Sequence, residues 1–260
     1  NICGFYKFGV PLSKPVQPIR PAATIILVRE AAESYEIFML KRTSKASFAS
    51  GMFVFPGGRV DGDDHLHKYD AHRTGPSDAQ AAQVTALGDE WRGYWIAAIR
   101  ETFEEAGLLL AYRDGKLISF ADDATHQKYD AFRPPLHDGE LSLLSICQQE
   151  GLKLAVDQIH FYNRFVTPQG RPRRFDTRFF IASAPEAQRG SHDEKETVDS
   201  IWITPQEALK RNANKEFDLM NVTRMQLEWL GEHSNKQAVL KMAEAKSEFS
   251  VRRPVMPVEA

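Results

Sequence analysis

The chain contains the stretch Arg100-Glu101-Thr102-Phe103-Glu104-Glu105-Ala106-Gly107-Leu108, which combines three glutamates with one arginine. A helix through these residues places Glu101, Glu104 and Glu105 on one face, because residues at i, i+3 and i+4 are neighbours on a helix surface. The opposite face is apolar and is formed by Ile96, Ile99, Phe103 and Ala106. We therefore expect an amphipathic helix over residues 95–106, ended by Gly107, with one face buried and three carboxylates on the other.

Three carboxylates on one helix face repel one another by roughly 0.2–0.5 kcal/mol per pair on an isolated helix. Such a cluster is either a solvated surface or a site for a hard cation, because Mg²⁺ and Mn²⁺ prefer carboxylate oxygens. The stretch Phe55-Pro56-Gly57-Gly58-Arg59 favours the cation site. It predicts a tight glycine turn that lets the backbone approach a ligand, and three acids follow it at Asp61, Asp63 and Asp64.

Together the two stretches resemble the signature of the Nudix hydrolases, Gx5Ex7REUxEExGU, in which U is an aliphatic residue. Residues 100–108 match its second half, with Thr102 at an aliphatic position. Gly58 and Asp64 match its first half, with aspartate in place of glutamate. The family places seven residues between the acid and the arginine, whereas 35 lie between Asp64 and Arg100, so about 28 residues are inserted. In this respect the chain resembles the peroxisomal coenzyme A diphosphatases of animals, a branch with a long insertion at this place.

The resemblance implies an α/β fold of the Nudix type, an α/β/α sandwich with a mixed sheet and helical insertions. It also implies that Glu101, Glu104 and Glu105 bind Mg²⁺ or Mn²⁺, with a backbone carbonyl oxygen of Gly57 or Gly58 as a further ligand.

The resemblance also bears on the roles of the other charged residues and on the general base, whose position varies within the family. Arg100 is expected to orient the glutamates rather than to contact the substrate, and the role of Asp64 is left open. The general base is either Glu101 or one of two acids ahead of the last predicted strand, Glu194 and Glu196.

A second resemblance concerns the substrate. Nudix enzymes acting on coenzyme A often carry LLTxR(S/A)x3Rx3Gx3FPGG, and Arg42, Gly51 and Phe55 to Gly58 occupy matching positions, while Ser47 replaces the second arginine. We expect substrate contacts from Arg42, Lys45, Phe55 and Arg174. A 3′-phosphate would be recognised by Lys41, Arg42, Lys45 or the basic run Arg171–Arg174.

The expected reaction is hydrolysis of coenzyme A or an acyl-CoA at its diphosphate, which gives 3′,5′-ADP and a phosphopantetheine. ADP-ribose or NADH is the alternative substrate. A non-catalytic Nudix-like domain that senses a nucleotide is the alternative function.

Composition limits the partners. The 260 residues include 33 Lys and Arg against 35 Asp and Glu, a net charge of −2 that gives no bulk attraction to nucleic acid or to an anionic membrane. No apolar run approaches the ~20 residues of a transmembrane helix, and the two cysteines, Cys3 and Cys147, favour a reducing compartment. We therefore expect a cytoplasmic protein with a small nucleotide substrate and no nucleic-acid or membrane partner, and we leave a homodimer open.

The predicted organisation is a lead-in at 1–21, a Nudix domain at 22–215 and C-terminal helices with a tail at 216–260. Within the domain we expect the insertion at 65–92 and a helical insertion at about 120–158. Strands are expected at 22–28, 35–40, 108–112, 161–166, 175–182 and 198–203. Further helices are expected at 77–87, 138–150, 218–230 and 236–245, and one begins after Thr204 with Pro205 at its first position.

Overall fold

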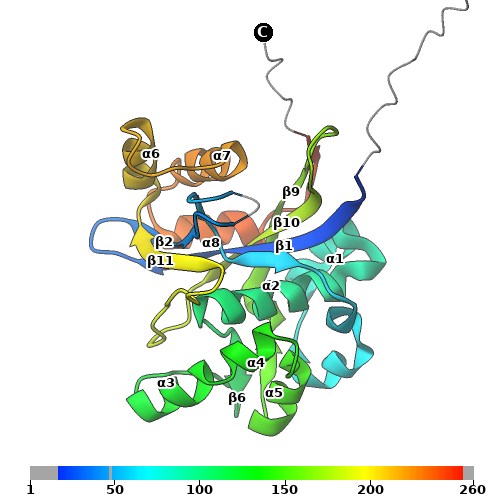
Figure 1. Cartoon of the computed structure of the whole chain (residues 1–260). Coiled ribbons are helices and arrows are strands. Elements are labelled where there is room, and N and C mark those ends of the chain that lie inside the picture. The colour runs from blue at the N-terminus through cyan, green and yellow to red at the C-terminus, as the bar shows by residue number, and fades with distance from the viewer. Residues whose placement is uncertain (1–16, 47–48, 254–260) are drawn as a thin grey trace, which may run out of the picture.

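The fold is built on a mixed eight-stranded sheet (Figure 1), and the computed structural model describes residues 17–46 and 49–253. Most of the predicted lead-in, together with Cys3, Ser47 and the end of the tail, lies outside the described residues. The main strand order is β11-β2-β1-β10-β9-β12, with β3 paired to β2 and β4 to β1. The strands are β1 (Ile19–Glu30), β2 (Tyr35–Arg42), β3 (Phe53–Val54), β4 (Gly57–Arg59), β9 (Ile159–Val166), β10 (Arg174–Ser183), β11 (Thr197–Ile203) and β12 (Val251–Arg252).

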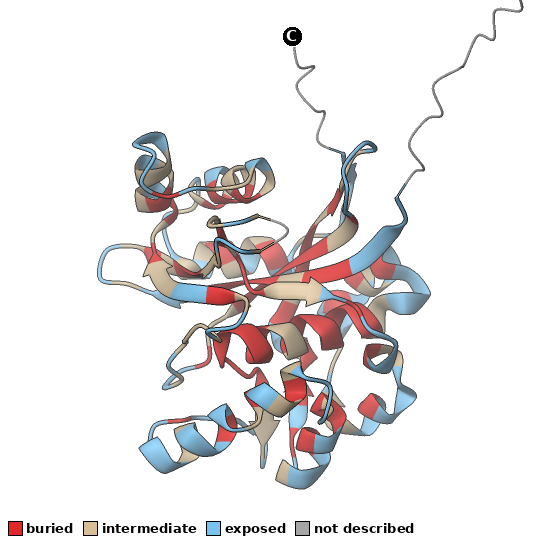
Figure 2. Cartoon of the chain, viewed as in Figure 1, coloured by how far each residue is buried: buried red, intermediate tan, exposed pale blue. Residues whose placement is uncertain are grey.

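Strand β1 lies inside the sheet and is buried on both faces, which explains its unbroken apolar run. It pairs parallel with β10 and antiparallel with β2 and β4. Because side chains alternate along a strand, Ile25 and Leu27 enter one core and Ile26 and Val28 enter the other. Figure 2 shows the resulting concentration of buried residues along the sheet and the helix below it.

Helices cover both faces of the sheet, as the α/β/α prediction requires (Figure 1). The motif helix α2 (Trp91–Ala106) contributes to the core that contains Ile25 and Leu27. The core on the other face, which contains Ile26 and Val28, is covered by α6 (Pro205–Ala213), α7 (Asn221–Leu230) and α8 (Lys236–Glu244). The Thr204 hydroxyl accepts the Glu207 N–H at 3.2 Å and so caps α6 as expected.

The segment between Asp64 and α2 is folded rather than an open loop. It contains short 3-10 helices over Gly62–His65 and His67–His72, strand β5 (Arg73–Thr74), a third 3-10 turn over Asp78–Gln80 and helix α1 (Ala81–Leu87). Strand β5 joins a second sheet of order β5-β8-β6-β7, whose other members are β6 (Ala111–Arg113), β7 (Lys116–Leu117) and β8 (Lys153–Ala155). Helices α3 (Asp123–Asp130), α4 (Arg133–His137) and α5 (Leu143–Glu150) lie on the same side of α2 as β6.

Four local predictions need correction. Gly57 and Gly58 form strand β4 after a bend at Pro56, not a tight turn, because they pair with β1. Helix α2 begins four residues earlier than expected. The strand expected at 108–112 is confined to 111–113, and the helix expected at 138–150 begins only at Leu143, where Ser142 caps it by accepting the Ser145 N–H at 3.1 Å.

The other predicted strands and helices occur near their expected positions. The boundaries of the predicted domains stay predictions. Within residues 17–46 and 49–253, every helix is too short or too polar to cross a lipid bilayer.

Candidate active site

The acidic face of α2 opens into a cavity of about 1430 Å³. This volume exceeds the 300–1,000 Å³ that is typical of sites for drug-sized ligands. The lining comes from α2, β4 and the acidic segment after it, the α4–α5 region, the β9–β10 hairpin and the beginning of α7. A site of this size suits a substrate with several separate groups.

Helix α2 is fixed rigidly behind the cavity. The predicted apolar face is fully buried, since Ile96, Ile99, Phe103 and Ala106 have no exposed surface. Trp95 is also fully buried and donates its indole N–H to the carbonyl oxygen of Ile159 at 2.9 Å. Gly107 ends the helix in a left-handed conformation and donates its N–H to the Phe103 carbonyl at 3.0 Å.

The acidic face is not a solvated surface. Only 7% of Glu104 and 4% of Glu105 is exposed, and all three glutamates line the cavity. The alternative reading of the cluster as a solvated helix face is therefore wrong. Burial of this kind costs free energy unless the charges are paired, protonated or bound to a cation.

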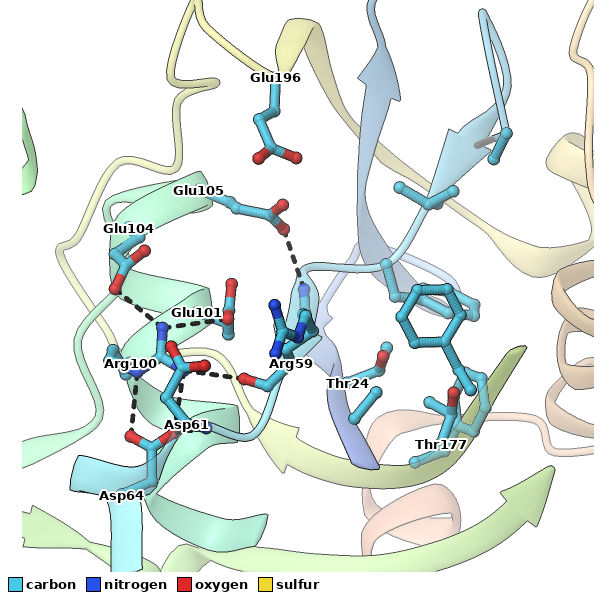
Figure 3. A pocket seen from close by; sticks show the side chains of 18 of the residues that line it. Thr24, Arg59, Asp61, Asp64, Arg100, Glu101, Glu104, Glu105, Thr177 and Glu196 are labelled. Carbon is cyan, nitrogen blue, oxygen red and sulfur yellow. Dashed lines mark hydrogen bonds and ion pairs between the residues drawn. The ribbon is translucent and has the colours of Figure 1, made fainter. Parts of the chain in front are cut away.

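Arg100 joins the two halves of the signature (Figure 3). Its guanidinium binds Asp64 through two hydrogen bonds of 2.9 Å each and donates to Glu101 and Glu104 at 3.0 Å. It also donates to the carbonyl oxygen of Arg59 at 2.8 Å. Asp64 is only 1% exposed, so the insertion has not moved it out of the site. Arg100 is thus placed to orient the carboxylates.

The two glycines of β4 are required by close packing. The Gly57 N–H donates to Glu105 Oε2 at 2.9 Å, and a Cβ at this position, where φ is +153°, would lie 2.6 Å from the Thr24 Cα. A Cβ on Gly58 would overlap the carboxylate of Glu101. Glycine therefore lets the backbone lie directly against the acidic helix.

The carboxylates are held in an unfavourable electrostatic environment. Burial is the largest cause of the raised pKa of Glu101, and repulsion from Glu104 and Asp64 adds to it while Arg100 opposes it. Burial and then the charge of Glu101 raise the pKa of Glu105. Burial likewise raises the pKa of Glu104, against the effect of Arg100. A divalent cation would relieve this repulsion, so the chemistry of the donor set fits Mg²⁺ or Mn²⁺.

The geometry differs from a preformed metal centre. Within the described residues, no group of three or more His, Cys, Asp or Glu side chains has the arrangement of a metal site. The reason is visible in Figure 3: Arg100 holds Glu101 and Glu104, while the backbone of β4 holds Glu105. The ligand set of Glu101, Glu104, Glu105 and Gly58 stays a prediction.

Glu196 lies across from Glu105 in Figure 3 and lines the cavity. It accepts a hydrogen bond of 3.0 Å from Arg42, whose Nε is buried without a hydrogen-bond partner in the part of the chain that the structure describes. Asp193 fixes the segment by accepting the backbone N–H groups of Glu196 and Thr197 at 3.1 and 2.8 Å. Of the two acids considered for this segment, Glu196 faces the cavity, whereas Glu194 is exposed and does not line it.

Of the four residues expected to contact the substrate, two line the cavity and two do not. Arg42 and Phe55 line the cavity, whereas Lys45 is exposed and does not. Arg174 does not line it either, because its side chain is buried and donates to the carbonyl oxygens of Thr167 and Gln17 at 3.1 and 3.3 Å. The expected roles of Lys45 and Arg174 are therefore not supported by their positions. Arg171 and Arg173, from the same basic run, line the cavity instead.

Other lining residues carried no signal in the sequence. His137 of α4 has its Nδ1 4.0 Å from Glu104 Oε2. Thr24 and Thr177 come from neighbouring strands, and Arg59 extends from β4 into the view of Figure 3. Thr24, Thr177 and His137 are brought to the site by the fold, so no local pattern could have identified them, whereas Arg59 directly follows the glycine pair of the signature.

Comparison with known proteins gives a consistent result. The family model described as the NUDT19 Nudix domain matches residues 76–222. The acyl-coenzyme A diphosphatase NUDT19 of Xenopus laevis is 27% identical over 74% of this chain and 58% of its own length. The putative nudix hydrolase 7 of Caenorhabditis elegans is 31% identical over 76% of this chain and 56% of its length. The chain thus spans less than two thirds of these curated relatives.

A solved structure supports the architecture. The crystal structure of a NUDIX hydrolase from Alicyclobacillus acidocaldarius superposes with a TM-score of 0.72, at 24% identity, over 86% of this chain and 96% of its own. This likeness concerns the fold alone, and it confirms the predicted α/β/α class.

Proposed function

Since the chain belongs to the family of the NUDT19 Nudix domain, we propose that it is a metal-dependent hydrolase of coenzyme A or acyl-CoA. The bond cleaved would be the diphosphate, and the products would be 3′,5′-ADP and a phosphopantetheine. The relatives named as acyl-coenzyme A diphosphatases in Xenopus laevis and Gallus gallus support this substrate.

One observation carries the proposal. Arg100 binds Asp64 across the insertion and holds Glu101 and Glu104 at the edge of a large cavity. The parts of the signature are therefore assembled in space although 35 residues separate them along the chain. A nucleotide sensor needs no such preserved acidic face, which is why we favour an enzyme.

Glu101, Glu104 and Glu105 would hold Mg²⁺ or Mn²⁺, with a carbonyl oxygen of Gly58 beside them. When bound, such an ion stabilises negative charge on phosphoryl oxygens and lowers the pKa of a bound water. Arg100 would keep the carboxylates oriented, because its guanidinium donates to Asp64, Glu101 and Glu104. Phe55 and Arg42 would contact the substrate from the same cavity.

Two acids are candidates for the general base. Glu101 is packed against Gly58 and shares Arg100 with its neighbours. The Glu196 carboxylate points toward Glu105 in Figure 3 and accepts a hydrogen bond from Arg42. Glu101→Gln should impair both metal binding and turnover, whereas Glu196→Gln should reduce kcat without changing metal affinity if Glu196 is the base. If Glu196→Gln keeps the metal affinity and the activity of the wild type, Glu101 is the remaining candidate for the general base.

The proposal is tested by hydrolysis of coenzyme A, acetyl-CoA, ADP-ribose and NADH with Mg²⁺ or Mn²⁺. The variants Glu104→Gln and Glu105→Gln should lose activity by at least about a hundredfold, because each removes one charged ligand. Lys153→Gln, an exposed substitution on β8 away from the cavity, is the matched control. Faster cleavage of ADP-ribose than of coenzyme A would show that ADP-ribose is the preferred substrate. Nucleotide binding without any turnover would favour a non-catalytic domain that senses a nucleotide.

A further inference from the structure

The cavity is lined by charged groups of both signs. The glutamates of α2 line it on one element, and Arg171 and Arg173 line it at the β9–β10 hairpin. Both arginines are exposed and form no ion pair with any acid among residues 17–46 and 49–253. Their charge is thus available to an anion in the cavity.

The hairpin is anchored at its base. Thr167 donates its N–H to the Phe175 carbonyl at 2.9 Å, and its hydroxyl accepts the Phe175 N–H at 3.1 Å. Arg174 then binds the Thr167 carbonyl at 3.1 Å and the Gln17 carbonyl at 3.3 Å, which ties the hairpin to the beginning of β1. The basic run therefore divides into one structural arginine and two that are presented to the cavity from a fixed support.

Part of the cavity wall is apolar. It includes Phe55, Phe165, Phe179, Leu219 and Val222, and Phe165 and Phe179 pack edge to face with their centroids 5.6 Å apart. An aromatic wall suits a nucleoside base, and guanidinium groups suit a phosphate because they can donate two hydrogen bonds to it in parallel. The cavity lining therefore combines an acidic face, aromatic side chains and two arginines.

We propose that Arg171 and Arg173 form a second anion subsite that binds a phosphate monoester on the nucleoside end of the substrate. This inference rests on the proposed function and refines it. The acidic face would act on the diphosphate through its metal, while the hairpin distinguishes a ribose that carries a 3′-phosphate from one that does not.

The experiment measures binding first, so that it does not depend on turnover. Affinities for 3′,5′-ADP and for 5′-AMP are determined by calorimetry for the wild type, Arg171→Gln/Arg173→Gln and the control Lys153→Gln. The wild type should prefer 3′,5′-ADP by about tenfold, as expected for charge-assisted hydrogen bonds at an exposed site. The double variant should lose this preference while it keeps its affinity for 5′-AMP, and added salt should weaken the preference.

Turnover is then compared for coenzyme A and dephospho-coenzyme A. The double variant should lose kcat/KM about tenfold for coenzyme A only, mainly through KM. Retention of the 3′,5′-ADP preference in the double variant, or its absence in the wild type, would overturn the proposal. A preference that depends on the two arginines, without hydrolysis of either compound, would uphold the subsite and refute the proposed function.

Discussion

The hydrogen bonds of Arg100 lead to a quantitative prediction about stability. Arg100→Met removes the only cation bound to Asp64 among the described residues and leaves that buried carboxylate unpaired. Breaking a buried pair in this way typically costs about 3–5 kcal/mol of unfolding free energy. The same substitution also removes a donor from Glu101 and Glu104, so the upper part of this range is expected.

Helix α2 offers a matched control in Arg92→Met. Arg92 binds Asp70 through two hydrogen bonds of 3.0 Å, the same geometry as Arg100 with Asp64. Asp70 is 39% exposed, however, whereas Asp64 is 1% exposed, and Asp70 keeps a second partner in Arg73. Exposed pairs contribute about 0–1 kcal/mol, so burial alone predicts a difference of at least about 2 kcal/mol between the two variants.

The assay is urea unfolding in metal-free buffer, followed by tryptophan fluorescence. The cost of Arg100→Met should also shrink as the pH falls, because unpaired buried carboxylates take up protons and become neutral. Equal unfolding free energies for the two variants would refute the inference that Arg100 holds the divided signature together.

Three further predictions concern the site and its support. Gly58→Ala should lower kcat on the order of tenfold to a hundredfold, because its Cβ would displace the carboxylate of Glu101; an unchanged kcat would contradict the close packing of Gly58 against Glu101. Burial raises the pKa of Glu101, so between the ordinary and the raised pKa this side chain carries a proton in the folded protein but not in the unfolded chain. The unfolding free energy of the metal-free protein should therefore fall as the pH rises through this range. Glu101→Gln or added Mg²⁺ should reduce that fall in unfolding experiments. Trp95→Phe should cost roughly 1–3 kcal/mol in urea unfolding, since it opens space behind α2 and removes the bond to the Ile159 carbonyl; a smaller cost would mean that α2 is held mainly by its other contacts.

The sequence predicted those features that depend on local periodicity. The apolar face of α2, its end at Gly107 and the cap at Thr204 all follow from spacings of three or four residues, and the structure has each of them. Strands β1 and β2 likewise occur near the expected residues 22–28 and 35–40. In these cases neighbouring residues determine the outcome.

Contacts between segments that are distant along the chain could not be predicted from the sequence. The pair of Arg42 and Glu196 joins residues 154 positions apart, and nothing near either residue indicates it. The basic hairpin shows a different limit, because composition identified the arginines but not the direction of each side chain. Arg174 was expected at the substrate, yet it is turned to the backbone of Thr167 while Arg171 and Arg173 line the cavity.

The insertion shows why a divided signature can still form one site. Lengthening a flexible connection from seven to 35 residues costs only about 1.4 kcal/mol in loop closure, because the entropy grows with the logarithm of length. Removing either partner of the buried Asp64–Arg100 pair is expected to cost more than this, because the other charge is then left buried and unpaired. The inserted residues also bury Tyr69 and Leu87 in the core that contains α2, and Tyr69 lines the cavity itself. Because the segment both packs against the motif helix and forms part of the cavity wall, removing it would restore the family spacing but open one side of the substrate site.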